Sequence, residues 1–175
     1  AFVAMNYSFA KTQIENLVTE GFSGIKTYHE WGAIAPDTSA SKHAHFDEVV
    51  RTTPTSWRQK NADAAPLMYY PVLDTGWDSR PWHGDKAFVI DGRNPEHFGK
   101  LLEQAKIFCT ESNKPLVILG PVNEWGEGSY IEPCTEFGFD MLECIRDVFG
   151  IKPATGWPEN ISPADIGRGP YDFRP

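Results

Sequence analysis

Two glutamates, Glu124 and Glu127, lie three residues apart after an apolar run, 115–120, that is typical of a buried strand. Charged groups are costly to hold near a core unless they are paired, hydrated or used in chemistry. A continuing strand would direct the two carboxyls to opposite faces, so they converge only if the chain turns between them. Gly126 and Gly128 permit this turn, because glycine adopts positive φ at little steric cost. Two converging carboxyls are what the hydrolysis of a glycosidic bond requires, one as general acid and one as general base.

The segment around these glutamates also carries side chains that suit sugar binding. The candidates for substrate contacts here are Asn123, Trp125, Tyr130 and Glu132. Glu132 either orients Glu127 or binds a sugar hydroxyl. The alternative interpretation is a solvated loop with incidental acids, since the ExxE spacing is common on helix surfaces. The strand end and the neighbouring rings favour the catalytic interpretation.

Two other segments follow predicted strands and add candidate substrate contacts. Trp77 has a ring that can stack on a sugar, while Asp78 and Arg80 either bind hydroxyls or brace one another through a charge-assisted hydrogen bond. Tyr28 and His29 follow an earlier strand, and His29 is placed to bind a hydroxyl or to tune a catalytic carboxyl. The competing interpretations are a structural turn for the first segment and a hydrogen-bonded structural histidine for the second.

No metal or organic cofactor is expected. His43 and His45 form an HxH pattern near Asp37 and Asp47, but no third ligand has a diagnostic spacing, and a solvated loop is the preferred interpretation. Signatures of phosphate-binding loops, dinucleotide sites and GxSxG nucleophiles are missing from the sequence. Ser129 lies among acids without an obvious histidine partner, so a serine nucleophile is not expected.

Charge and composition exclude several classes of partner. The net charge is −8 and no Lys/Arg cluster stands out, which argues against a nucleic-acid partner. No apolar run approaches the roughly 18 residues of a membrane span. The three cysteines, Cys109, Cys134 and Cys144, make no CxxC pattern, and their odd number argues against a full disulfide framework. One disulfide and one free thiol remain an open alternative.

Apolar runs typical of strands alternate along the chain with segments of helical periodicity, and this order predicts four strand–helix units. The expected pairs are 2–6 with 10–20, 24–28 with a helix in 46–64, 66–73 with 95–110, and 116–122 with 137–149. Pro54 lies within the second helix, which is therefore expected to start after it or to break there. Repeated strand–helix alternation predicts an α/β fold with a parallel sheet.

Long polar loops follow the predicted strands, as the loops that carry the active site do in a (β/α)8 barrel. Four units are half of such a barrel, which typically runs to about 250 residues. We therefore expect residues 1–150 to form the C-terminal half of a TIM-barrel catalytic domain, or else an unusual small α/β domain. Residues 151–175 are rich in Pro and Gly and predict an irregular C-terminal strap.

The segment 123–133, NEWGEGSYIEP, closely resembles the WbsX-like proteins, which are relatives of glycoside hydrolase family 99 often described as lipopolysaccharide-biosynthesis glycosyltransferases. The segments 76–81, GWDSRP, and 94–98, NPEHF, are also similar to theirs, and the resemblance runs from about 24 to 150. It implies a (β/α)8 barrel whose site lies at the C-terminal ends of the strands, a carbohydrate substrate, and no cofactor. It also implies that the N-terminal half of the barrel, which this chain lacks, is its partner, and it favours a secreted or periplasmic location.

The same resemblance implies roles for the two glutamates in a retaining glycosidase. Glu124 matches the residue that deprotonates the sugar's 2-hydroxyl, which then attacks the anomeric carbon to give a 1,2-anhydro sugar. Glu127 matches the general acid/base. Gly126 stands where mannose-processing members carry a histidine, which argues against mannan as substrate. Two alternatives stay open: a glycosyltransferase of surface-polysaccharide synthesis, although no phosphate-cradling loop or DxD motif is seen, and a non-catalytic carbohydrate-binding domain.

Overall fold

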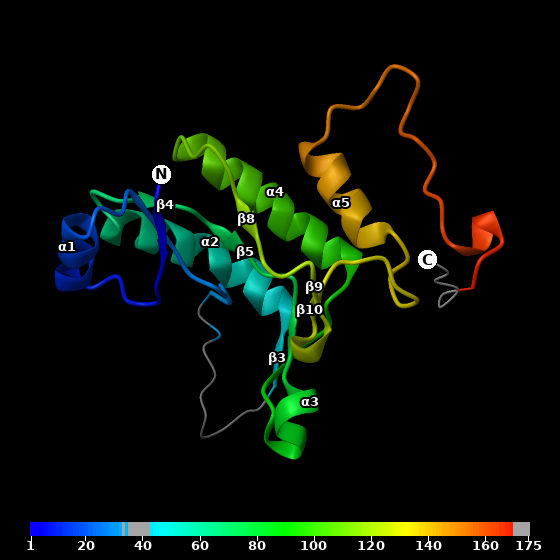
Figure 1. Cartoon of the computed structure of the whole chain (residues 1–175), viewed down its shortest axis with the longest axis horizontal. Coiled ribbons are helices and arrows are strands. Elements are labelled where there is room, and N and C mark those ends of the chain that lie inside the picture. The colour runs from blue at the N-terminus through cyan, green and yellow to red at the C-terminus, as the bar shows by residue number, and fades with distance from the viewer. Residues whose placement is uncertain (33, 35–42, 170–175) are drawn as a thin grey trace.

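The computed structural model describes residues 1–32, 34 and 43–169. Its strands are β1 (Val3–Met5), β2 (Gly24–Lys26), β3 (His43–His45), β4 (Met68–Tyr69), β5 (Val72–Leu73), β6 (Trp77–Asp78), β7 (Val89–Asp91), β8 (Ile118–Leu119), β9 (Asn123–Glu124) and β10 (Ser129–Tyr130). Its helices are α1 (Lys11–Thr19), α2 (Phe46–Asp63), α3 (Arg80–His83), α4 (Pro95–Glu111) and α5 (Asp140–Phe149), with short 3₁₀ turns η1 (Gly84–Lys86), η2 (Trp125–Glu127) and η3 (Ala164–Ile166). Figure 1 shows their arrangement.

Parallel strands lie side by side in chain order. β1, β2 and β4 form one parallel sheet, and β5 pairs in parallel with β8. β4 and β5 are consecutive pieces of one extended segment, interrupted at Pro71, which has no N–H to offer a neighbouring strand. This segment therefore joins β2 on one side to β8 on the other. The predicted α/β fold with parallel strands is confirmed, while the described residues form no closed sheet.

Helices α2, α4 and α5 pack beside one another, with α4 in the middle (Figure 1). Helix α4 begins at Asn94, whose side chain accepts a hydrogen bond from the His97 amide, and has Pro95 in its first turn. Its buried residues recur at helical spacing: Phe98, Leu101, Leu102, Ala105 and Phe108. An amphipathic helix with this spacing lies flat against the strands and the neighbouring helices.

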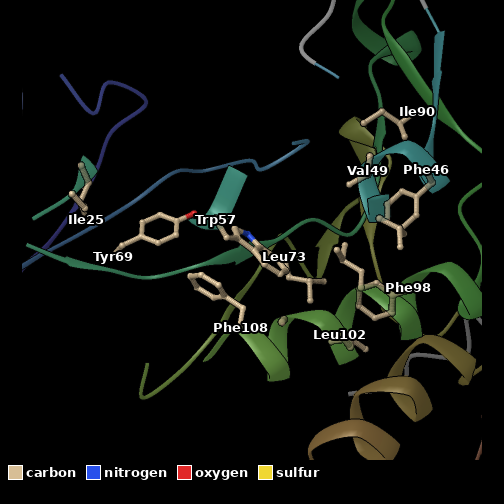
Figure 2. Packing of buried hydrophobic residues seen from close by; sticks show 14 of the residues in the cluster. Ile25, Phe46, Val49, Trp57, Tyr69, Leu73, Ile90, Phe98, Leu102 and Phe108 are labelled. Carbon is tan, nitrogen blue, oxygen red and sulfur yellow. The ribbon is translucent and has the colours of Figure 1, made fainter. Parts of the chain in front are cut away.

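The core joins these helices to the strands. Trp57 of α2 is fully buried, packs on Phe108 and donates a hydrogen bond from its indole nitrogen to the Val72 carbonyl at 2.9 Å. Figure 2 shows Trp57 beside Leu73 and Phe108, with Phe98 and Leu102 of α4 further along the same cluster. The packing therefore fixes β5, the strand that leads directly into Asp74.

Two details differ from the sequence-based expectation. Helix α2 runs through Pro54 without stopping, because it buries Phe46 and Val49 before the proline and Trp57 after it. An interior proline costs about 3 kcal/mol, which burial of large side chains on both sides can offset. The loops after β2 and β5 also contain an unpredicted sheet, in which β7 pairs in parallel with β3 and antiparallel with β6.

The part of the chain after α5 has little regular structure. Its described residues, 151–169, contain only η3, and they contact α5 through Asn160, which donates to Glu143, and through Trp157, whose ring lies under Arg146. Residues 170–175 of the predicted strap lie outside the described residues. Within the part that the structure describes, no helix has both the length and the apolar character to cross a membrane.

Candidate functional site

Polar side chains gather where the parallel strands end. Tyr7 follows β1, His29 follows β2, Asp74 follows β5 directly, and Glu127 lies in the loop after β8. The phenol of Tyr7 accepts a hydrogen bond from the His29 amide at 3.4 Å. The His29 ring lies between Asp74 and Glu127: Nδ1 is 3.1 Å from Asp74 Oδ2, and Nε2 is 3.8 Å from Glu127 Oε2. Four segments far apart in sequence thus meet at one edge of the sheet.

A tight turn separates the two glutamates. β9 and β10 pair in an antiparallel ribbon, and η2 forms the connection between them. Gly128 closes the turn at φ 65°, and a Cβ there would lie 2.6 Å from Asp78 Cβ, so both conformation and space require glycine. The turn predicted from the two glycines is present, and it directs Glu127 toward His29.

Both glutamates act on the phenol of Tyr28. Burial raises the pKa of Tyr28 above its ordinary value, and the negative charges of Glu127 and Glu124 raise it further. The charges of both carboxyls therefore influence one hydroxyl, and the glutamate pair itself stays a prediction. Asn123, Glu124 and Tyr28 also line one hollow of about 340 Å³.

Neutralising Glu127 should lower the pKa of Tyr28. Because the Glu127 carboxylate disfavours a neighbouring phenolate, Glu127→Gln removes one cause of the raised pKa while the burial effect stays. Ultraviolet titration of the wild type and of the Glu127→Gln variant, each with a Tyr28→Phe partner for subtraction, measures this shift. Glu143→Gln on α5 is the control and should leave the titration unchanged. An unaltered Tyr28 curve in Glu127→Gln would show that the two groups do not interact.

Asp74 is a fully buried carboxylate that anchors the segment carrying His29. It accepts hydrogen bonds from His29 Nδ1 and from the Glu30 amide, the latter at 2.9 Å. Trp31 and Trp77 enclose the His29 ring, with centroid separations of 5.1 and 4.8 Å. Acceptors on one side and indoles on two others hold the imidazole in a single orientation.

Glu30 connects the loop that carries His29 to helix α2. This buried carboxylate accepts hydrogen bonds from the Gly32 amide at 3.1 Å and from Ser56 at 2.9 Å, and it pairs with Lys60. Burial and the nearby Glu30 charge together raise the pKa of Tyr69. A buried carboxylate with several donors orders the backbone around it, so the chain that carries His29 is tied to α2.

The aromatic side chains of the 123–133 segment form a stack. Trp125 stacks on Tyr130 at 3.9 Å, and the Arg93 guanidinium covers Tyr130 at 4.1 Å from its ring centroid. The Tyr130 hydroxyl donates to Glu136 at 2.7 Å, and the Trp125 indole donates to Glu132 at 3.0 Å. Both faces of Tyr130 are covered, whereas Trp125 keeps 47% of its surface exposed and is the ring available to a ligand.

Arg93 lies in the loop between β7 and α4 and links that loop to two others. Its Nη1 donates to the carbonyls of Thr75 at 2.8 Å, Gly128 at 2.9 Å and Tyr130 at 3.0 Å. These carbonyls belong to the loop after β5 and to the loop that carries Glu127. A single buried cation therefore fixes the spacing between the two loops.

Asp78 and Arg80 brace one another. Arg80 Nε donates to Asp78 Oδ1 at 2.9 Å, and Nη2 lies 2.5 Å from Oδ2. The side-chain hydrogen bond from Arg80 holds the pKa of Asp78 below its ordinary value. Both residues still line a hollow of about 390 Å³ with Trp77, Trp125 and Tyr130, so bracing and ligand contact are compatible there.

The candidate metal ligands of the sequence, His43, His45, Asp37 and Asp47, do not form a metal-binding cluster within the described residues. These residues contain no group of three or more His, Cys, Asp or Glu side chains arranged to hold a metal ion. His43 instead lies 2.6 Å from Asp91, and Asp37 falls outside the described residues. Cys109, Cys134 and Cys144 are all free thiols.

A sequence-family comparison decides which group of proteins the chain falls into. The family model described as glycosyltransferase WbsX matches residues 4–145. The chain belongs to the WbsX family. The match covers the described strands, except for the first residue of β1, and the site segments 28–31, 74–82 and 123–136.

Curated and solved relatives of this WbsX-family chain are distant and longer. The uncharacterized protein WxcX of Xanthomonas campestris pv. campestris is 26% identical over 105 residues, which are 55% of this chain and 15% of WxcX. The GH99 endo-α-mannosidase of Bacteroides thetaiotaomicron is 20% identical, with a TM-score of 0.52 over 85% of this chain and 42% of the mannosidase. A glycoside hydrolase-like protein is 16% identical, with a TM-score of 0.53 over 74% of this chain and 38% of that protein.

At these identities the structural likeness shows the fold alone. The WbsX-family chain spans less than half the length of the solved structures it matches, and far less of WxcX. Sequence reasoning singled out the glutamates and most of their aromatic neighbours as candidates, but it assigned no role to Asp74, Arg93 or Trp31. Asp74 alone carried a signal, since it directly follows the buried pair Val72–Leu73.

Proposed function

We propose that this WbsX-family chain carries the catalytic pair of a glycoside hydrolase that acts on a polysaccharide or glycan. The observation that carries the proposal is that both glutamates lie near the segment 28–29 at the C-terminal ends of parallel strands: Glu127 is 3.8 Å from His29, and Glu124 lines one hollow with Tyr28. Active sites of α/β barrels lie at this edge. Beside the pair lies an exposed indole, Trp125, of the kind that stacks on sugar rings.

The chemistry follows the resemblance to glycoside hydrolase family 99. Glu124 takes the proton of the sugar's 2-hydroxyl, whose oxygen attacks the anomeric carbon as the bond to the leaving oxygen breaks. Glu127 gives its proton to that leaving oxygen. Water then attacks the anomeric carbon of the 1,2-anhydro sugar while Glu127 takes a proton from the water and Glu124 returns its proton to the 2-oxygen, so the released sugar retains its anomeric configuration. This differs from the common retaining scheme, in which a carboxylate attacks directly.

We also propose that further β/α units complete a (β/α)8 barrel around this site. The chain spans 42% of the mannosidase that it resembles. β1 and β8 each have one neighbour only among the described strands, and apolar side chains next to these two edges are open to solvent. Phe2, just before β1, is 75% exposed, and Val122, just after β8, is 50% exposed. Further units would cover both edges and supply the remaining substrate contacts.

A glycosyltransferase is the second candidate, because the description of the family itself favours it. Such an enzyme needs a site for a nucleotide-sugar donor. Calorimetry with nucleotide sugars separates the candidates: tight binding supports the transferase, and a flat titration supports the hydrolase.

A third candidate is a carbohydrate-binding domain without catalysis. It predicts loss of sugar affinity in Trp77→Ala and no hydrolysis by the wild type.

The direct test is incubation of the full-length protein with bacterial surface polysaccharides, followed by measurement of new reducing ends. Proton NMR of the first product formed reports its anomeric configuration. Reducing ends with retained configuration support the proposal. Product of inverted configuration would rule out the anhydro-sugar mechanism, and transfer from a nucleotide sugar without hydrolysis would replace the hydrolase with the transferase.

A further inference from the structure

His29 has one nitrogen satisfied and one nitrogen unpartnered. Nδ1 lies 3.1 Å from Asp74 Oδ2, whereas Nε2 is buried and has no hydrogen-bond partner. Only 9% of the His29 side chain is exposed. Nε2 faces the Glu127 carboxyl, whose Oε2 lies 3.8 Å away. An unpaired polar atom that points at a proposed catalytic acid requires an explanation.

The contacts fix which nitrogen carries the proton. Asp74 is fully buried, and an ionised carboxylate can only accept, so His29 Nδ1 must donate. A neutral ring paired with Asp74 in this way is the Nδ1–H tautomer, and its Nε2 lone pair faces Glu127.

We propose that Asp74 and His29 form a positioning dyad that holds Glu127 in its acid form, with His29 Nε2 as acceptor for the carboxyl proton. This inference rests on the proposed function, in which Glu127 is the general acid. A shift of about 1 Å closes the present gap to a normal hydrogen-bond length. A neutral acceptor favours the protonated carboxyl, whereas an N–H donor at the same place would favour the carboxylate.

Within residues 1–32, 34 and 43–169, few other ionisable groups lie around His29. Besides Asp74 and Glu127, the titratable groups of this part of the chain that lie near it are the phenols of Tyr7 and Tyr28, with Glu124 beyond Tyr28. Trp31 and Trp77 cover the remaining ring surface. The proton on Nδ1 thus depends on Asp74 alone.

The tautomer is read directly by NMR, without any substrate. Long-range ¹H–¹⁵N spectra of the ¹⁵N-histidine-labelled full-length protein at neutral pH distinguish the Nδ1–H, Nε2–H and doubly protonated rings, and His29→Gln identifies the His29 signals. We expect Nδ1–H in the wild type and a switch to Nε2–H in Asp74→Asn, whose amide can donate to Nδ1. A doubly protonated ring or an Nε2–H tautomer in the wild type would overturn the dyad.

Kinetics give the second readout. Asp74→Asn should lower kcat on polysaccharide by roughly 10²-fold with little change in KM, since the dyad touches the acid and not the sugar. The alkaline limb of its pH–rate profile should also move to lower pH. An aryl glycoside, whose leaving group needs little protonation, should be cleaved almost as fast as by the wild type. Equal losses on both substrates would show that Asp74 serves folding instead.

The hydrolase proposal and the Asp74–His29 dyad would be refuted by different results. If no glycoside is hydrolysed, the proposed function fails, and the NMR spectra still report the tautomer. If hydrolysis occurs but the ring is doubly protonated, only the dyad is lost. Circular dichroism of Asp74→Asn, compared with that of the wild type, reveals a folding defect independently of either result.

Discussion

The Glu127→Gln variant is expected to lose roughly 10²- to 10⁴-fold in kcat on a polysaccharide, which is the usual contribution of a general acid. Glutamine keeps the size and the hydrogen-bonding reach of the side chain but has no proton to give. Substrate binding should change little, because the other contacts in the site stay in place. Initial rates of reducing-end release, together with binding measured by calorimetry, separate the two effects.

Leaving-group chemistry makes this test specific. For an aryl glycoside with an acidic phenol, Glu127→Gln should show a much smaller loss in kcat/KM for phenol release, which reports the bond-breaking step. Glu124→Gln should impair both substrates, since activation of the 2-hydroxyl is needed whatever the leaving group. Glu111→Gln, an exposed glutamate on α4, is the matched control and should behave as the wild type. Full activity of Glu127→Gln on the polysaccharide would refute its role as the acid.

Replacing Arg93 with methionine should both destabilise the protein and impair the site. Methionine fills much of the same volume but cannot donate to the three carbonyls of Thr75, Gly128 and Tyr130. We expect a loss of about 3 kcal/mol in the free energy of unfolding, from the charged hydrogen bonds and the carbonyls left unpaired. Because the loop carrying Glu127 would lose its anchor, kcat/KM should fall by roughly 10²-fold.

Urea denaturation monitored by tryptophan fluorescence measures the stability change. Arg58→Met is the control, since Arg58 makes an exposed ion pair with Glu111 and should contribute less than about 1 kcal/mol. Arg93→Lys keeps the charge but cannot reach all three carbonyls, so it should lie between the wild type and Arg93→Met. Equal stability of Arg93→Met and the wild type would mean that other contacts hold the two loops together.

Local sequence signals predicted the local features of this fold well. The order of strands and helices follows from apolar periodicity, and α4 starts where Asn94 and Pro95 indicate. The turn at 125–128 follows from Gly126 and Gly128, because no other residue fits the conformation and space at position 128. In each case a few neighbouring residues determine the outcome, so a single sequence contains the information.

Features that depend on distant contacts could not be predicted. The continuation of α2 through Pro54 depends on packing of Trp57 against Phe108, which lies on another helix. The role of Arg93 depends on carbonyls that are 18 to 37 positions away in the chain, and the backbone carbonyl of any residue type is an equally good acceptor. Asp74 gains its importance from His29, which precedes it by 45 positions.

Position 126 illustrates how a missing side chain shapes the rim of the site. A Cβ on Gly126 would lie 3.1 Å from the indole of Trp82 and 3.3 Å from Glu124 Oε1. Trp82 is 68% exposed and occupies the space that a larger residue at 126 would fill. An imidazole there, as in the mannose-processing relatives, would push this indole outward and crowd the carboxyl. Any side chain at 126 therefore requires the neighbouring indole and carboxyl to shift by a few tenths of an ångström, so the conformation of Trp82 and the residue at 126 are coupled.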